Sequence, residues 1–187
     1  MPTRSSTQRS RATASSSRKK KSARAARTRP RSNGASDALS LLHADHEAVG
    51  AMIDEIEECE AGDERLRDLA KSMATALTAH AKIEEDLFYP ELRDRAEGEE
   101  QLTDVFEAYT EHDVIKHLLA LVKSDRGPDE KFKAELQVLG ESVKHHVKEE
   151  ESTIFKLART SMSRDELQEC GAAMSEEKSR LQKSARP

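Results

Sequence analysis

The sequence predicts an all-α protein, and three observations support this fold class. Charged residues make up 36% of the 187 residues, aromatic residues make up only 3%, and tryptophan is absent. Alanine, leucine, glutamate, lysine and arginine dominate the chain, and runs of β-branched or aromatic residues are few. Apolar residues also recur every three or four positions over four long segments, as on one face of a helix. We therefore expect helices and no sheet-built core.

The first two amphipathic segments follow a polar amino-terminal region and are separated by glycine-containing turns. The first begins after Ser36, which suits a helix N-cap, and ends at Gly62. The second runs to about Arg95, ahead of Gly98. Pro90 is expected to kink or shorten its last turns, because proline cannot donate a backbone hydrogen bond.

The third and fourth segments are organised in the same way. The third ends before Gly127, and Pro128 suits the first turn of the fourth. A short fifth helix follows Ser163, which forms a capping-box pattern with Glu166. Four long helices joined by short turns predict an up-down-up-down four-helix bundle, followed by this short carboxyl-terminal helix.

The charge distribution divides the chain into a basic tail, residues 1–36, and an acidic remainder. The tail holds eleven lysine and arginine residues, no acidic residue and no Leu, Ile, Val or Phe, so we expect it to be disordered. The remainder holds 20 basic and 36 acidic residues, a balance of −16 with histidine neutral. We divide it into the four-helix domain, residues 37–160, and a carboxyl-terminal helix and tail, residues 161–187.

The basic tail has several possible roles. It can contact nucleic-acid phosphates without reading the sequence, although it has no aromatic residue to stack on bases. It can instead be a solubilising extension, or fold back on the acidic domain. An organellar transit peptide has a similar composition, but it needs an apolar helical face and this segment offers only alanine.

Other sequence features indicate a soluble cytoplasmic protein. The two cysteines, Cys59 and Cys170, are far apart, so a disulfide framework is not expected and a reducing compartment fits. No stretch approaches the roughly 18 apolar residues that indicate a membrane span. The amino terminus also lacks the apolar region of a secretory signal peptide.

Histidines and glutamates on the apolar faces of the four helices point to a metal site. Residues four apart lie on one helical face, and two helices carry such a His–Glu pair while the other two carry an inward histidine. The six residues are His46, His80, Glu84, His112, His146 and Glu150. A lone core histidine usually needs no metal, but six inward polar groups are costly to bury unless something binds them. Helical bundles build dimetal sites from such groups. Nitrogen and oxygen donors without thiolate favour iron or manganese, and make a structural zinc site a weaker alternative.

The motifs around these residues resemble those of one known family. The chain contains L-L-x-x-D-H at residues 41–46, H-x-x-x-E-E-x-L-F-Y-P at 80–90, E-H-D at 111–113 and H-H-V-K-E-E-E at 145–151. In this order they resemble the hemerythrin-like, HHE cation-binding domain, over roughly residues 37–160. The resemblance implies a four-helix bundle in which the same six side chains hold two non-haem irons, bridged by carboxylates and a solvent oxygen.

The sequence differs from the oxygen-carrying hemerythrins at one ligand position. Those proteins have a second histidine one turn after the third-helix histidine, and Lys116 stands there in this chain. His117 points roughly 140° away from His112 around the helix, and His43 is another possible replacement. A site of four histidines and two glutamates resembles other branches of the family, associated with iron, oxygen or redox sensing and peroxide chemistry.

The fourth helix presents two adjacent histidines. Oxygen carriers place the last carboxylate five residues after its histidine, which pairs His145 with Glu150. The apolar stripe instead turns His146 inward, and we predict this register, with His145 in solvent or beside the ligands. Tyr109, one turn before His112, is either a core aromatic residue or a hydrogen-bond donor near the metals.

Three further acidic residues lie next to the predicted ligands in the sequence: Glu85, Glu149 and Glu151. Each is either part of a solvated acidic face or a partner that orients an imidazole. The chemistry of the whole set leaves several functions open. We expect a di-iron protein that reacts with oxygen, peroxide or nitric oxide as a sensor or binder. A peroxide-removing enzyme, an iron-handling protein and a nucleic-acid-associated protein are the alternatives.

Overall fold

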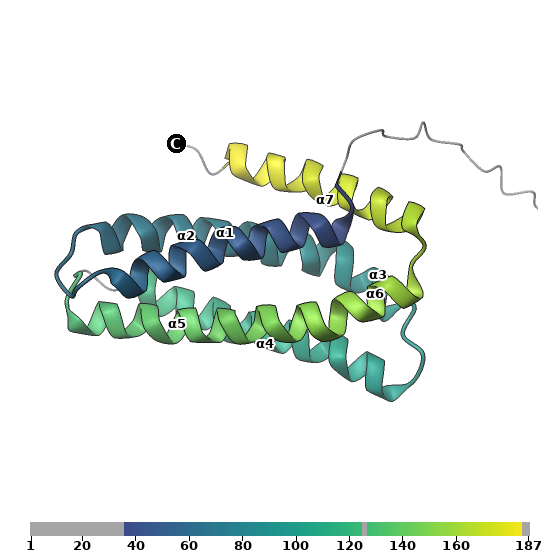
Figure 1. Ribbon diagram of the computed structural model, residues 1–187, viewed down its shortest axis with the longest axis horizontal. Coiled ribbons are helices and arrows are strands. Elements are labelled where there is room, and N and C mark those ends of the chain that lie inside the picture. The colour runs from purple at the N-terminus through teal and green to yellow at the C-terminus, as the bar shows by residue number, and fades with distance from the viewer. Residues whose placement is uncertain (1–35, 125–126, 185–187) are drawn as a thin grey trace, which may run out of the picture. The chain divides into compact units, whose positions relative to one another are not determined.

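The computed structural model describes residues 36–124 and 127–184, which form helices joined by short turns (Figure 1). In chain order the helices are α1 (Ala38–Glu58), α2 (Arg65–Ile83), η1 (Glu84–Phe88), α3 (Tyr89–Arg93), α4 (Glu99–Ser124), α5 (Glu130–Glu149), η2 (Glu150–Ile154), α6 (Phe155–Ser161) and α7 (Arg164–Ser184). No strand occurs within these ranges, which confirms the all-α class. The disorder and nucleic-acid contacts expected for the basic tail concern residues that lie outside the described part, apart from Ser36.

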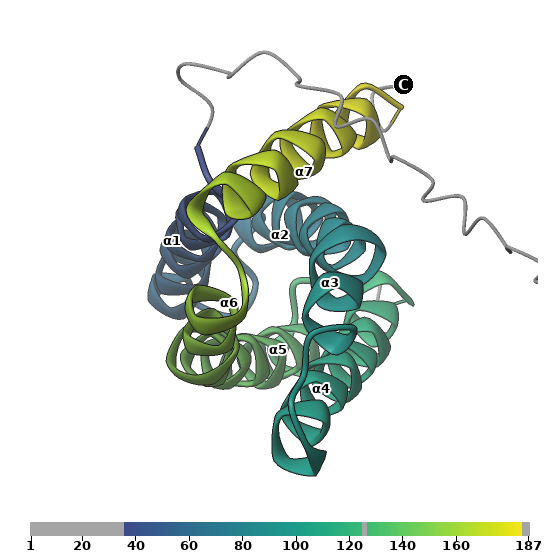
Figure 2. The same cartoon turned by 90° about the vertical axis from the view of Figure 1, so that its right-hand side faces the viewer.

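Four long rods form the bundle. Helix α2 continues through η1 into α3, and α5 continues through η2 into α6. Helix α1 packs against α2, α4 packs against α5, and the two hairpins meet through the pairs α1–α5 and α2–α4. The end-on view in Figure 2 shows these helices arranged around a common axis, with α7 crossing outside α1 and α2. The up-down-up-down prediction is therefore confirmed.

Helix ends differ from the sequence predictions in local detail. The first N-cap is Asp37 and not Ser36, because the Asp37 carboxylate accepts the Ser40 N–H at 2.9 Å. Helix α1 ends at Glu58, and Gly62 lies in the following turn with φ near 91°, a conformation that favours glycine. Helix α5 begins after Asp129, whose carboxylate caps it by accepting the Phe132 N–H at 3.0 Å.

The carboxyl-terminal helix begins as predicted but is longer. Ser163 and Glu166 form the capping box: the Ser163 N–H donates to Glu166 at 2.7 Å, and the Glu166 N–H donates to the Ser163 hydroxyl at 3.3 Å. Helix α7 then runs for 21 residues, so the prediction of a short helix was wrong. Its apolar stripe is narrow, with Leu167, Gly171 and Met174 as its buried positions, which explains the underestimate.

Two apolar clusters fill the bundle and leave a polar layer between them. One cluster surrounds Leu42, Phe88 and Ala108, and the other surrounds Leu77 and Leu139. His46, His80 and His112 each lie about one turn from both clusters along their helices. His146 lies one turn after Val143 of the Leu77 cluster and about two turns before Ile154 of the Leu42 cluster, so the four imidazoles are enclosed by apolar side chains from two sides. The polar layer is therefore shielded from water, and its groups must satisfy one another or bind a ligand.

Each of the two continuous rods contains one turn of π-helix, which the sequence reading did not predict. The Tyr89 N–H bonds to the Glu84 carbonyl, and the Phe155 N–H bonds to the Glu150 carbonyl, five residues back in both cases. Such turns occur often at functional sites. Pro90 follows the first turn without ending the rod, and the second turn has no proline, so proline alone does not explain the geometry.

Two findings concern the wider sequence predictions. Among the described residues, none of the helices is both long and apolar enough to cross a membrane. Cys59 and Cys170 are both free thiols in the structure. Burial raises the pKa of the Cys170 thiol to about 11, so this group is a poor nucleophile at neutral pH.

Candidate metal centre

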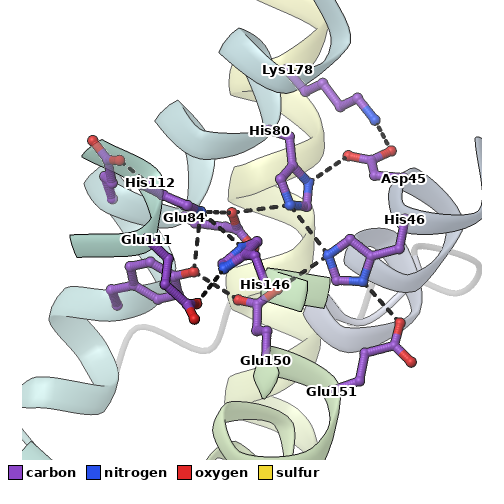
Figure 3. Close-up of polar contacts among 12 residues, drawn as sticks. Asp45, His46, His80, Glu84, Glu111, His112, His146, Glu150, Glu151 and Lys178 are labelled. Atoms are coloured by element: carbon purple, nitrogen blue, oxygen red, sulfur yellow. Dashed lines mark hydrogen bonds and ion pairs between the residues drawn. The ribbon is translucent and has the colours of Figure 1, made fainter. Parts of the chain in front are cut away.

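The structure brings all six predicted residues together in the polar layer (Figure 3). Each of them is buried, and none exposes more than 6% of its surface. Their helices of origin are α1 (His46), α2 (His80), η1 (Glu84), α4 (His112), α5 (His146) and η2 (Glu150). Every rod of the bundle therefore contributes to one buried cluster, whose binding of metal stays a prediction.

The donor atoms have the spacing expected of ligands that share one metal ion. His46 Nε2 lies 3.2 Å from His80 Nε2, and His112 Nε2 lies 3.1 Å from His146 Nε2. Glu84 Oε2 lies 3.1 Å from His80 Nε2 and 3.3 Å from His112 Nε2. Donors about 2.1 Å from one ion, at right angles to each other, lie about 3.0 Å apart. The residues present therefore fit a metal centre.

The donors form two groups that share one carboxylate. The first group consists of His46, His80, Glu84 and Glu150, and the second of Glu84, His112 and His146. Within each group the donor atoms lie within 4.8 Å of one another. Glu84 belongs to both, and its Oε2 faces one histidine of each group, so this carboxylate would be shared by a pair of cations. The second group has one donor fewer than the first.

A carboxylate holds the outer nitrogen of every imidazole in the cluster. Asp45 faces His80 Nδ1 at 3.4 Å, and the other three contacts measure 2.8 Å. Those three pairs are Glu151 with His46, Glu85 with His112, and Glu111 with His146. An ionised carboxylate only accepts hydrogen bonds, so Nδ1 carries the proton and a neutral imidazole has a bare Nε2.

This tautomer explains why the cluster favours a cation. Two bare Nε2 atoms 3.1 to 3.2 Å apart direct lone pairs at each other unless a proton or a metal ion lies between them. Glu84 Oε1, Glu84 Oε2 and Glu150 Oε2 are also buried without a well-directed hydrogen bond within the described residues. A divalent cation satisfies both sets of lone pairs.

Burial and neighbouring charges shift the pKa values of several clustered residues. Burial and the negative charge of Glu150 raise the pKa of Glu84 well above its ordinary value. Burial alone lowers the pKa of His46, but its contacts with Glu150 and Glu151 outweigh burial and raise this pKa to about 9. Burial lowers the pKa of His80 to about 4. Protons and metal ions therefore compete for the centre.

The outer carboxylates repeat with the two halves of the bundle. The interval between the two histidines is 34 residues for His46 and His80, and 34 for His112 and His146. Asp45 immediately precedes the first histidine of the first half and contacts the second, His80, which is 35 residues further along. In the same way Glu111 precedes the first histidine of the second half and contacts His146, again 35 residues further along. The motifs D-H and E-H-D therefore contained a positional signal for Asp45 and Glu111, which sequence reasoning had left without a role.

Tyr89 is a buried member of the centre that sequence reasoning missed. Its hydroxyl donates to Glu150 Oε1 at 2.9 Å and lies 3.4 Å from His112 Nε2. In a regular α-helix Tyr89 points roughly 140° away from Glu84, but the π-turn brings it to the same face. Tyr109, one turn before His112 in the sequence, donates at 3.4 Å to the Glu85 carbonyl instead.

The remaining candidate ligands lie outside the cluster. His145 is exposed and contacts Glu111 at 3.3 Å, whereas His146 is buried in the centre, so the predicted register is the one observed. His117 is exposed. His43 is also exposed and contacts Glu151 at 2.8 Å. None of these outer histidines reaches the two groups of donor atoms.

A cavity of about 550 Å³ lies beside the centre, between α4 and the α5–η2 rod. Its lining includes Ala108, Val114, Ile154, His145 and five acidic residues, Asp104, Glu107, Glu111, Glu149 and Glu150. Glu150 is the member of the centre that borders it. Another cavity, of about 530 Å³ against α2, is lined by none of the six clustered residues. The cavity beside η2 therefore borders the centre through Glu150.

Comparison with known sequences identifies the family of this site. Residues 37–158 match the hemerythrin HHE cation-binding domain. The chain belongs to this family. Membership accounts for the bundle and for the buried His/Glu cluster, and it assigns metal-cation binding to the hemerythrin HHE domain described here.

Two similar proteins add to the comparison. A crystal structure of a hemerythrin HHE cation-binding domain-containing protein from Mycobacterium kansasii superposes with a TM-score of 0.69 at 21% identity, over 80% of this chain and 90% of that one. This likeness supports the hemerythrin fold. A DNA nickase from Nostoc sp. is 28% identical over 143 residues, which is 76% of this chain and 39% of the nickase. The chain thus spans about two fifths of that relative.

The two adjacent histidines of the hemerythrin HHE domain permit a matched mutational test. We expect His146→Ala to lose at least one metal ion per chain, because its Nε2 belongs to the second donor group. His145→Ala and His117→Ala remove exposed imidazoles and should leave the metal content unchanged. Metal analysis of the three purified variants checks this. A halved content in the His145 or His117 variant would show that the helix phase is wrong.

Proposed function

We propose that this chain binds two non-haem iron ions through the six clustered residues and reacts there with oxygen, peroxide or nitric oxide. In this proposal it acts as a cytoplasmic oxygen or redox sensor or binder. One observation carries it: four imidazoles, each held at Nδ1 by a carboxylate, belong to two groups of donor atoms that share one buried carboxylate, Glu84. This arrangement orders the ligands before any ion binds, which lowers the cost of binding.

The chemistry of the donors favours iron. Imidazole nitrogen and carboxylate oxygen suit iron, and manganese is the nearest alternative, because both metals accept mixed nitrogen and oxygen ligands. Neither cysteine belongs to the cluster, so the thiolate ligands typical of structural zinc sites are absent from it. When bound, iron would supply exchangeable electrons and a coordination position for a small molecule. A protein that binds manganese but not iron would identify manganese as the metal instead.

The surrounding residues determine what can reach the centre. Burial of all six side chains excludes large substrates and bulk water. The Tyr89 hydroxyl holds a proton between Glu150 and His112, where it can donate to a small ligand beside the three-donor group. The cavity along η2 gives small molecules access on the Glu150 side. These features favour diatomic or similarly small reactants.

Exposure of the iron-loaded protein to small oxidants tests this function. The protein is loaded with ferrous iron without air, and the visible spectrum is then recorded with oxygen, hydrogen peroxide or nitric oxide. A stoichiometric spectral change supports a sensor or binder, and reversal on removal of oxygen identifies a binder. Many turnovers of peroxide per chain would instead show an enzyme. Release of iron to an acceptor, without reaction with any of the three molecules, would show iron handling.

A nucleic-acid role is the second candidate, and two observations favour it. The tail of residues 1–36 is strongly basic, and the Nostoc relative is a DNA nickase. The buried centre cannot accept a DNA backbone, because none of its six side chains is more than 6% exposed. We therefore propose that any DNA contact uses the tail, through its cations and DNA phosphates.

Deletion of residues 1–36 tests this second candidate. We expect the shortened chain to keep its metal content, because none of the clustered residues lies in the tail. Its retention on DNA should fall to background, and retention of the full chain should weaken steeply with added salt. Gel-shift titrations with both chains at two salt concentrations measure this. Equal DNA affinity of the two chains would contradict a role for the tail.

A further inference from the structure

Helix α7 contacts the centre although it lies outside residues 37–158, which match the hemerythrin HHE domain. The Lys178 ammonium group donates to Asp45 Oδ1, and Asp45 Oδ2 faces His80 Nδ1 at 3.4 Å. Figure 3 shows these three side chains in a row that leads from α7 to the imidazole cluster. The row connects a helix outside the matched domain to one of the clustered histidines.

Lys178 occupies an inward position of α7. The residues that mark this stripe are Leu167, Gly171, Met174 and Leu181. Lys178 lies four residues after Met174 and three before Leu181, and its side chain is only 23% exposed. A lysine in such a place loses hydration and needs a partner, and Asp45 is that partner.

The contact between α7 and α1 fixes where Lys178 lies. A Cβ atom added to Gly171 would come within 2.5 Å of the Ala38 backbone nitrogen, so the two backbones touch at this point. Lys178 is seven residues, or about two helical turns, further along α7. The position of α7 on α1 therefore sets the distance from Lys178 to Asp45.

The Asp45 contact differs from the three other outer contacts of the centre. The aspartate is one methylene shorter than the glutamates elsewhere, and its distance to the imidazole is 3.4 Å compared with 2.8 Å. Both of its oxygens are used, by groups on two different helices, and it is only 13% exposed. Lys116, the lysine beside Glu85, is 46% exposed and so is more loosely held.

We propose that Lys178 is a positioning residue of the metal centre, which holds Asp45 so that Asp45 orients His80. This inference rests on the proposed metal function and extends it to α7. Loss of Lys178 leaves Asp45 free to turn toward solvent, and His80 then loses the group that fixes its Nδ1. The effect falls on the first donor group, because His80 belongs to it, and leaves the second group of His112 and His146 intact.

Lys178→Gln tests the proposal, with Lys178→Arg as the rescuing variant and Lys183→Gln, an exposed lysine of the same helix, as the matched control. Iron binding is titrated against a competing chelator, and the visible spectrum and reduction potential of the loaded centre are recorded. We expect Lys178→Gln to bind one of its two ions about 10- to 100-fold more weakly, the cost typical of losing an outer partner of a ligand. The second ion should bind as in the wild type, and Lys178→Arg should restore most of the affinity.

Nitrogen NMR of the metal-free proteins separates this inference from the metal assignment. We expect the His80 imidazole signals to change in Lys178→Gln, and the His146 signals to stay in place. Unchanged His80 signals, or equal effects in the Lys183→Gln control, would overturn the positioning role. Wild-type protein that binds no iron would contradict the proposed function, while the His80 signals would still decide whether Lys178 orients this imidazole.

Discussion

Glu84→Gln is expected to abolish binding of at least one of the two metal ions. The same carboxylate lies 3.1 Å from His80 Nε2 and 3.3 Å from His112 Nε2, so it is the one side chain common to both donor groups. Loss of an outer partner weakens metal binding 10- to 100-fold, so loss of a shared ligand should cost more than about 100-fold. Titration with ferrous iron against a chelator measures this.

The metal-free Glu84→Gln protein should remain folded. Burial and Glu150 raise the pKa of Glu84 well above its usual range, and glutamine keeps the shape of this side chain without placing a negative charge in the buried cluster. Glu149→Gln is the matched control, because that half-buried carboxylate lies on α5, the helix diagonal to α2 in the bundle, and outside the donor groups. Full iron occupancy in Glu84→Gln would contradict the shared position of this ligand.

Metal loading should raise the stability of the whole bundle. A ligand that binds only the folded state at about 1,000 times its Kd stabilises that state by about 4 kcal/mol. For a chain of this size each kcal/mol shifts Tm by roughly 2 to 4 °C, so we expect a rise of about 8 to 16 °C. Thermal unfolding with and without iron, under anaerobic conditions, measures the shift.

The Glu84→Gln variant provides the internal control for this measurement. Its metal-free Tm should equal or exceed that of the metal-free wild type, and its gain on adding iron should be largely lost. A similar gain in both proteins would mean that iron stabilises the chain at some other place. Equal Tm values for the wild type with and without iron would contradict a tight internal site.

Periodicity determined most of the fold. The apolar positions at three- and four-residue steps located the four long helices, and their short connections predicted the antiparallel arrangement that the structure confirms. Helix ends were harder, because Asp37 and Ser36 are both good caps and only the geometry of the turn selects between them. Helix α7 was underestimated, since much of its surface is polar and it packs through a narrow stripe.

The same phase argument placed the inward histidines. His146 and not His145 enters the centre because it continues the stripe of Val143 and Leu139, and His117 points outward for the converse reason. The structure brings all six predicted residues together, and their binding of metal stays a prediction. The resemblance to the hemerythrin HHE family strengthened this set, but the side-chain periodicity had selected it independently.

Departures from regular helix geometry hid the rest of the site. Tyr89 follows Glu84 by five residues, a separation that faces inward in a π-turn and outward in an α-helix. Phe155 follows Glu150 by the same five residues across the second π-turn, and its ring stacks on that of His46, with 5.9 Å between the ring centroids. Lys178 was hidden differently, because its partner Asp45 lies 133 residues away and nothing local marks a lysine as inward.

The iron content of the reconstituted full chain tests the central claim most directly. The protein is loaded with ferrous iron without air, freed of unbound metal and analysed for iron and protein together. The structure-based account predicts two irons per chain, one for each donor group that shares Glu84. A wild-type chain that retains no iron would contradict the di-iron site. A Glu84→Gln variant that retains as much iron as the wild type would contradict it as well.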